Sequence, residues 1–172
     1  MRIITTPMCE EVVRLAGIKH YKVNKNPDLE DGDLAILLSE SKVEMNSLAI
    51  KLNTPLQLFE SIKEVSKLKN ELSDEEILEF FKDYEYCFKY LENHENSQIK
   101  VKVYSNFLKD IILNIGFEIT SENYDYVIFP DYLKDKIQNE DSQLVEIPSH
   151  TVVSKNPFER IETRYAILEK LI

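Results

Sequence analysis

A cysteine near the start of the chain stands in a local sequence that favours its deprotonated, reactive form. Thr6 suits an N-cap and Pro7 suits the first helical position. Glu10 and Glu11 are residues that the positive end of a helix dipole favours. Cys9 therefore falls in a first helical turn, where backbone N–H groups lower the pKa of a thiol, although the two glutamates oppose that effect. Two roles follow for Cys9: a functional thiol or metal ligand, and a structural cysteine under the sheet edge.

A histidine in the second half of the chain is the best partner for such a thiol. His150 follows Pro148 and Ser149 at the end of a predicted strand. If it faces Cys9 across the two halves, Cys–His chemistry or a shared metal becomes feasible. Glu40 and Asp131 are the candidates for the third group that a triad or a metal site needs. Cys9 and His150 are therefore the candidate catalytic residues.

Polar or small side chains directly follow the predicted strands. In an open α/β sheet, ligands bind beyond the carboxyl ends of the strands, because side chains and helix N-termini converge there. This rule predicts the following ligand-binding residues: Thr5, Thr6, Cys9, Ser39, Glu40, Ser105, Asn106, Asp131, Ser149 and His150. We expect the residues of the first half to face those of the second around one concave surface.

The elements that would position these residues occur twice in the chain. In each copy an apolar strand leads to a helix that stops on a glycine, Gly17 or Gly116, the residue that adopts a left-handed conformation most readily. An acidic residue, Asp33 or Asp125, then opens a buried-looking strand, and a further strand and a last helix complete the copy. This order predicts an α/β fold of tandem duplicated Rossmann-like βα half-units. The competing interpretation is that all βα units share one hydrophobic period.

A long helix is predicted to join the two halves. Residues 73–76 form a capping box, and apolar residues then recur at alternating spacings of four and three: Ile77, Phe81, Tyr84, Phe88 and Leu91. We predict a helix over 73–91 in a connecting segment of residues 70–98, between a first half at 1–69 and a second at 99–172. Its apolar stripe either packs on the halves or docks on another protein. Cys87, near the stripe, is interpreted as a core residue.

Charge and composition narrow the classes of partner. The chain has 21 basic and 31 acidic residues and a net charge of -10, so its overall field opposes a nucleic-acid backbone. With only three glycines, neither a dinucleotide-binding turn nor a Walker-type phosphate loop can be written. The two cysteines form neither a disulfide framework nor a CxxC metal pair. We therefore expect a small molecule or a protein as the partner, and no nucleic acid.

Hydropathy predicts where the protein resides. Every apolar run is far shorter than the roughly 18 to 20 residues that cross a bilayer. The first residues show no apolar stretch and no small-residue cleavage site of a signal peptide. We expect a cytoplasmic protein that does not associate with a membrane.

Two segments carry a resemblance to a known family. Residues 2–11 and the strand at residues 33–40, together with the size of the whole chain, resemble the methanogenesis marker protein 5 family of methanogenic archaea. The resemblance implies a cytoplasmic protein connected with methanogenesis. It implies no particular reaction or cofactor, and it supplies no catalytic residues.

The sequence thus favours a non-catalytic binding or accessory protein of methanogenesis, with a ligand cleft between two related α/β halves. No complete catalytic constellation is visible in the sequence, and this interpretation needs none. One alternative is a small enzyme that uses Cys9 in thiol or metal-assisted chemistry. Another is a structural subunit of a protein complex, held through the helix predicted at 73–91. The ligand, any cofactor and the oligomeric state stay open at this stage.

Overall fold

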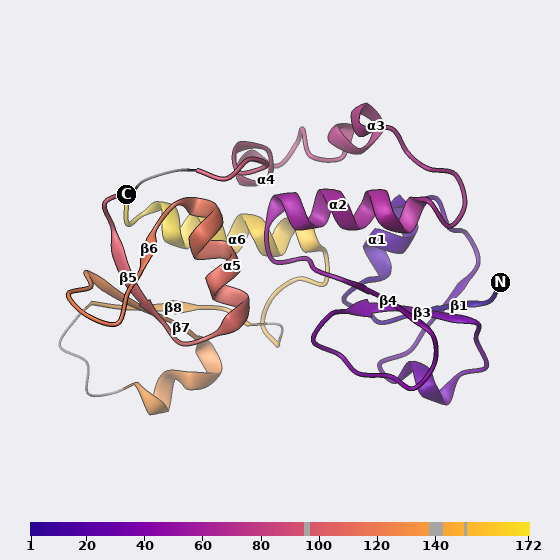
Figure 1. The fold of residues 1–172 in the computed structure, drawn as a ribbon, viewed down its shortest axis with the longest axis horizontal. Helices are drawn as coiled ribbons and strands as arrows, with labels where there is room; N and C mark the ends of the chain where they lie inside the picture. The colour runs from indigo at the N-terminus through magenta and orange to yellow at the C-terminus, as the bar shows by residue number, and fades with distance from the viewer. Residues whose placement is uncertain (95–96, 138–142, 150) are drawn as a thin grey trace.

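Two parallel β-sheets with their helices make up the fold (Figure 1). The computed structural model describes residues 1–94, 97–137, 143–149 and 151–172. The first sheet has the order β2-β1-β3-β4 and contains β1 (Ile3–Thr5), β2 (Tyr21–Val23), β3 (Leu34–Leu38) and β4 (Ser47–Ile50). The second has the order β6-β5-β7-β8 and contains β5 (Lys100–Val103), β6 (Glu118–Ile119), β7 (Tyr126–Pro130) and β8 (Gln143–Ile147). All neighbouring strands described are parallel, so the predicted α/β class is confirmed.

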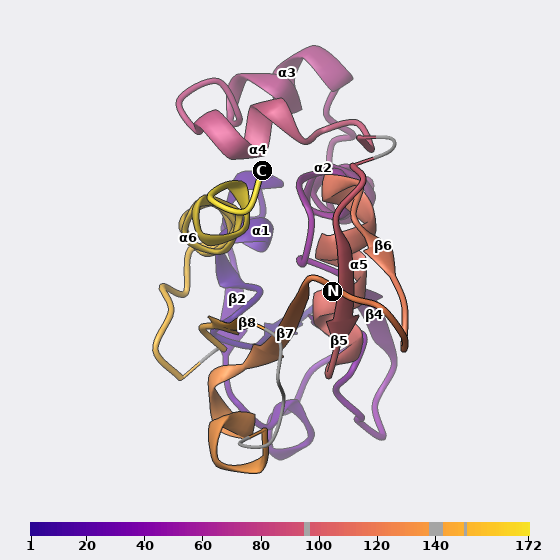
Figure 2. The same cartoon turned by 90° about the vertical axis from the view of Figure 1, so that its left-hand side faces the viewer.

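The helices cover the sheets and connect them. The first half carries α1 (Glu10–Leu15), η1 (Pro27–Leu29) and α2 (Pro55–Ser66), and the second carries α5 (Asn106–Ile115), η2 (Asp131–Lys136) and α6 (Pro157–Glu169). Between the halves, α3 (Asp74–Glu79) packs on α2 and α4 (Glu85–Lys89) packs on α6, and both form an outer layer (Figures 1 and 2). Within the described residues, none of these helices combines the length and the hydrophobicity needed to cross a bilayer.

Both predicted glycine stops are present. Gly17 has a φ of 78° and Gly116 a φ of 92°, the left-handed region that a residue without Cβ enters at little cost. In both places the glycine N–H bonds to the carbonyl three residues earlier, and the next N–H bonds to the carbonyl five residues earlier. This is the Schellman arrangement that ends a helix.

The acidic residue before the third strand of each sheet fixes the start of that strand. The Asp33 carboxylate accepts a 2.6 Å hydrogen bond from the N–H of Arg2, and the Asp33 N–H donates to the Arg2 carbonyl at 2.8 Å. Asp125 and Lys100 make the same exchange at 2.9 and 2.8 Å. Each aspartate therefore joins two neighbouring parallel strands at their amino ends.

The prediction of one continuous helix over residues 73–91 is wrong. The capping box at Ser73 and Glu76 is present and starts α3, but the helix ends at Glu79 and α4 begins only at Glu85. Between the two helices Tyr84 is extended, with φ -118° and ψ 108°, and the rings of Phe81 and Tyr84 both pack on Phe158 of α6, with centroids 4.9 and 4.6 Å away. Packing on α6 therefore prevails over the local helical periodicity.

The interruption also changes which connector residues are buried. After the break Cys87 and Tyr90 face inward, whereas Phe88, which the uninterrupted stripe would bury, is 56% exposed. The Cys87 N–H donates to Glu162 of α6 at 2.8 Å, and its Sγ lies 3.6 Å from the Phe158 carbonyl oxygen. The predicted core role of Cys87 is confirmed.

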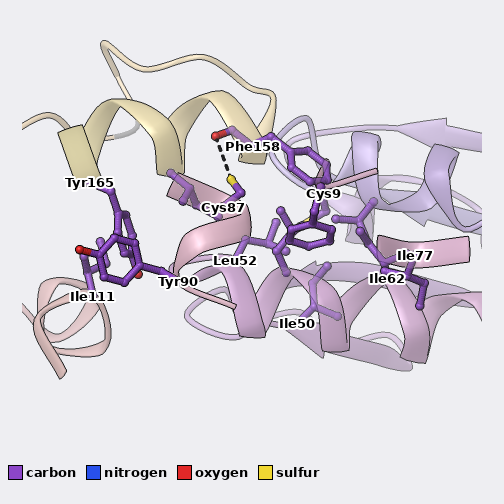
Figure 3. Close-up of a cluster of buried hydrophobic side chains, with 14 of the residues drawn as sticks. Cys9, Ile50, Leu52, Ile62, Ile77, Cys87, Tyr90, Ile111, Phe158 and Tyr165 are labelled. Atoms are coloured by element: carbon purple, nitrogen blue, oxygen red, sulfur yellow. Dashed lines mark hydrogen bonds between the residues drawn. The ribbon is translucent and has the colours of Figure 1, made fainter. Parts of the chain in front are cut away.

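One hydrophobic core extends through both halves and the connector. It contains Ile62 of α2, Ile77 of α3, Tyr90 after α4, Ile111 of α5 and Tyr165 of α6 (Figure 3). Each of these side chains is at most 1% exposed. Because the core is continuous, the two halves are held in a fixed relation to each other.

Candidate functional site

A cleft of about 860 Å³ lies where the two halves meet. Its volume falls in the range of about 300–1,000 Å³ that is usual for small-molecule sites. The first half contributes Met8, the last residue of β3 and the residues after β3 and β4: Leu38, Ser39, Glu40, Ser41, Lys51, Leu52 and Asn53. The second half contributes residues of α5 and the residue before it, one residue of η2 and two of α6: Ser105, Asn106, Phe107, Lys109, Asp110, Leu113, Tyr132, Arg160 and Arg164. The carboxyl ends of β3 and β4 therefore face the carboxyl end of β5 across the cleft.

The cleft brings together some of the residues predicted from the ends of strands. Ser39 and Glu40 line it from the first half, and Ser105 and Asn106 line it from the second. These four side chains are exposed or half-buried, so a ligand has access to them. They come from segments more than sixty residues apart in the chain, which makes the juxtaposition a property of the fold.

Other predicted residues do not line the cleft. Thr5 is fully buried, and its Oγ1 donates to the carbonyl of Ile36 at 2.9 Å, so it joins β1 to β3. Thr6 accepts, through its carbonyl, the N–H of Cys9 at 3.0 Å. Ser149 is 2% exposed, and His150 lies outside the described residues. Thr5, Thr6 and Ser149 therefore have structural surroundings and are not part of the cleft wall.

Cys9 belongs to the core and not to the cleft (Figure 3). Its side chain is fully buried at the N-cap of α1. Burial raises the pKa of Cys9 to about 11, and a hydrogen bond with Thr6 and the charge of Arg160 offset only part of this rise. The expectation of a lowered pKa at the helix start is thus wrong, because desolvation disfavours the thiolate more than the helix start favours it. Among the described residues, no group of His, Cys, Asp and Glu side chains is arranged to hold a metal ion.

The surroundings of both cysteines predict inert thiols. Cys9 and Cys87 are each fully buried, and burial raises the pKa of both. We expect Ellman's reagent at mildly alkaline pH to leave both thiols of the native protein unmodified and to titrate both after denaturation, since only the thiolate reacts. Rapid labelling of one thiol in the native state would restore the hypothesis of a reactive Cys9.

Two buried arginines of α6 are the functional candidates that the strand-end rule did not select. Arg160 and Arg164 are 2% and 3% exposed, yet both line the cleft. Arg160 donates through Nη1 to the carbonyls of Ser154 and Lys155 at 3.3 and 2.9 Å. Arg164 donates through Nε to the Pro148 carbonyl at 3.0 Å. Neither guanidinium has a carboxylate of the described residues within ion-pair distance.

Burial penalises the charge of both guanidinium groups. It lowers the pKa of Arg160 to about 10, and it does the same for Arg164, where the neighbouring charge of Arg160 contributes as well. Both side chains stay protonated at neutral pH. The second half of the cleft therefore presents two adjacent positive charges, and the described residues supply no ion-pair partner for either.

Asp131, which was predicted as a ligand-binding residue, lies close to this pair. Its Oδ1 is sealed from solvent and has no hydrogen-bond partner among the described residues. Burial acts to raise the pKa of Asp131, but hydrogen bonding from Ser149 and from the Tyr132 backbone, with the charge of Arg164, leaves the pKa below its usual value. Asp131 thus does not line the cleft, and its carboxylate lies beyond ion-pair distance of Arg164.

The polar floor of the cleft joins the two halves. The Asp110 carboxylate of α5 accepts hydrogen bonds from Asn53 at 3.1 Å and Gln57 at 2.9 Å, and Lys51 Nζ lies 3.7 Å from it. Asn53 and Gln57 stand at the start of α2, where the helix dipole adds to the attraction for this carboxylate. Asp110 is therefore engaged with the first half.

Comparison of the chain with protein-family models and with curated proteins found no match.

Proposed function

We propose that the chain is a non-catalytic small-molecule-binding protein whose ligand lies in the cleft between the two halves. One observation carries the proposal: segments that follow strands of both sheets, together with two buried arginines, line a single cleft of about 860 Å³. Such edges are where open parallel sheets bind ligands. The cleft also combines an apolar part, with Leu52 and Phe107, and a few charged and polar groups, which is the usual make-up of a binding site.

The structure gives less support to the other two interpretations. A thiol enzyme would need an accessible Cys9, and that side chain is fully buried. A structural subunit held through the connector would need an unpartnered apolar stripe, and Phe81, Cys87 and Tyr90 instead pack into the core of this chain. Phe88 alone of the predicted stripe is largely exposed.

We further infer that the halves are duplicated Rossmann-like units. The identical strand orders, the paired Schellman motifs at Gly17 and Gly116, and the paired clamps at Asp33 and Asp125 support this inference. Duplication accounts for the cleft, because two copies that face each other present their strand ends to a common space. The resemblance to the methanogenesis marker protein 5 family extends the proposal to a cytoplasmic accessory role in methanogenesis.

Blocking the cleft tests the proposed function. Ser39 is exposed in the cleft wall, so Ser39→Trp fills part of the space without removing a core contact. The wild-type protein is dialysed against a small-molecule extract of the cells that produce it, and retained compounds are identified by mass spectrometry. We expect at least one compound to be retained by the wild type and lost from the Ser39→Trp variant.

The matched control carries the same substitution away from the cleft. Asn70 is exposed in the loop after α2, and Asn70→Trp should retain the compound as the wild type does. Equal retention by all three proteins would show that the compound binds outside the cleft. Retention of nothing by the wild type would refute a small-molecule-binding function.

A further inference from the structure

We propose that the cleft binds the anionic group of its ligand, a phosphoryl or carboxylate group, through Arg160, Arg164 and the first turn of α5. This inference rests on the proposed function and specifies the chemistry of the ligand. Both anions offer oxygens that a guanidinium fork contacts in the same way.

The two buried arginines carry the inference. A buried charge is costly unless it is paired. Two buried guanidinium groups in one cleft, with no ion-pair partner in the described ranges of the chain, therefore favour an anionic partner from outside it. Arg164 uses only Nε within the described residues, and its terminal nitrogens stay open to the cleft. Arg160 uses only Nη1, so its Nε and Nη2 are likewise without an acceptor among those residues.

The start of α5 places further donors beside Arg164. The Arg164 guanidinium lies over the ring of Phe107, 4.9 Å from its centroid, and Phe107 is in the first turn of this helix. The Ser105 side chain does not cap the helix, and the N–H groups of Asn106, Phe107 and Leu108 have no acceptor among the described residues. By contrast, Thr54 caps α2 and Asn156 caps α6 with their own side chains. Open N–H groups next to an arginine are a common anion-binding arrangement.

The charges around the cleft favour an anion over a cation. Lys51, Lys109, Arg160 and Arg164 line it, against the carboxylates of Glu40 and Asp110. Asp110 is already engaged by Lys51, Asn53 and Gln57, and Asp131 does not line the cleft. The cleft is thus locally positive in a chain with a net charge of -10. The field of the whole protein would repel an anion at long range, so these cations are explained by an anion bound next to them in the cleft.

A tryptophan reporter makes anion binding measurable. The chain has no tryptophan, and Leu113 of α5 is 59% exposed where it lines the cleft. Leu113→Trp therefore supplies a single reporter, which is titrated with inorganic phosphate, with succinate and with chloride at matched ionic strength. We expect a saturable fluorescence change with phosphate, with succinate or with both, and none with chloride; a response to one anion alone identifies the group.

Substitutions on this background assign the response to the arginines. Arg164→Met and Arg160→Met should each weaken the affinity by about 10- to 100-fold, the usual effect of losing a charged hydrogen bond. Lys25→Met removes an exposed charge outside the cleft and should leave the affinity for the anion unchanged. Far-UV circular dichroism checks the fold of each variant. Arg164→Lys keeps the charge but loses the guanidinium fork, so its affinity for the anion should lie between those of the reporter protein and of Arg164→Met.

Two results would overturn the inference. One is the absence of a saturable response to phosphate and to succinate in the reporter protein. The other is an equal affinity in Arg164→Met, Arg160→Met and Lys25→Met. If neutral compounds are retained in the dialysis while no anion binds, the proposed cleft stands and only the assignment of an anionic ligand fails.

Discussion

Replacing Phe158 with alanine is expected to lower the free energy of unfolding by about 3–5 kcal/mol, the usual cost of truncating a buried phenylalanine. Phe158 is 2% exposed at the start of α6. Its ring packs edge-on against Phe81 and stacks on Tyr84, with centroids 4.9 and 4.6 Å apart. The substitution therefore leaves a cavity where the connector meets the second half. Urea denaturation followed by circular dichroism and by tyrosine fluorescence measures the loss.

The form of the transition is as informative as its midpoint. Since the core is continuous through both halves, both probes should report one coincident transition in the wild type and in Phe158→Ala. Phe88→Ala is the matched control: Phe88 is 56% exposed, and its truncation should change stability by less than about 0.5 kcal/mol. Two separated transitions, or an equal loss in both variants, would contradict a shared core at Phe158.

Replacing Arg164 with methionine, unlike replacing Phe158 with alanine, is not expected to lower the free energy of unfolding. Most substitutions of a buried residue destabilise, but this one removes a buried charge that has no ion-pair partner within the part of the chain that the structure describes. It also keeps an apolar stem over Phe107. It forfeits the hydrogen bond to the Pro148 carbonyl and the cation–π attraction between the guanidinium and the Phe107 ring. Because apolar replacements of buried charges are often neutral or stabilising, we expect stability to stay equal or to rise by up to about 2 kcal/mol.

A loss of stability in Arg164→Met would indicate a structural arginine. Arg14→Met serves as the control, because Arg14 is an exposed arginine paired with Glu11; its substitution should cost less than about 1 kcal/mol. A stability gain at Arg164 together with a loss of anion binding is the signature of a residue kept for function at the expense of the fold. A decrease of several kcal/mol would contradict that role.

Local sequence rules predicted most of the elements, because they depend on neighbours along the chain. Gly17 and Gly116 end their helices because a residue without Cβ enters the left-handed region at little cost. The capping box at Ser73 depends only on two residues three positions apart. The prediction of one continuous helix in the connector was wrong for the opposite reason, since the structure of the connector depends on residues far away in the chain. The position of Phe81 depends on Phe158, a residue more than seventy positions away, and no periodicity within 73–91 records that contact.

The same distinction explains the site. Ser39, Glu40, Ser105 and Asn106 were found from their place after strands, a rule that holds wherever parallel sheets form. Arg160 and Arg164 stand four residues apart on one helix face, which for exposed residues is the commonplace pattern of a charged surface. Arg160 and Arg164 differ from that pattern in being buried with no carboxylate of the described ranges within ion-pair distance, and their burial follows from how α6 lies against the cleft. Cys9 shows the reverse, since its local sequence favours a reactive thiol and its burial prevents one.

The most direct test of the cleft is to map a bound compound by nuclear magnetic resonance. The compound retained in the dialysis experiment is added to ¹⁵N-labelled protein, and changes in amide chemical shift are assigned along the chain. We predict that the largest changes fall in both halves together, at residues 39–41, 51–53 and 105–107, which line the cleft. Changes confined to one half, or centred on α3 and α4, would contradict a ligand site between the sheets.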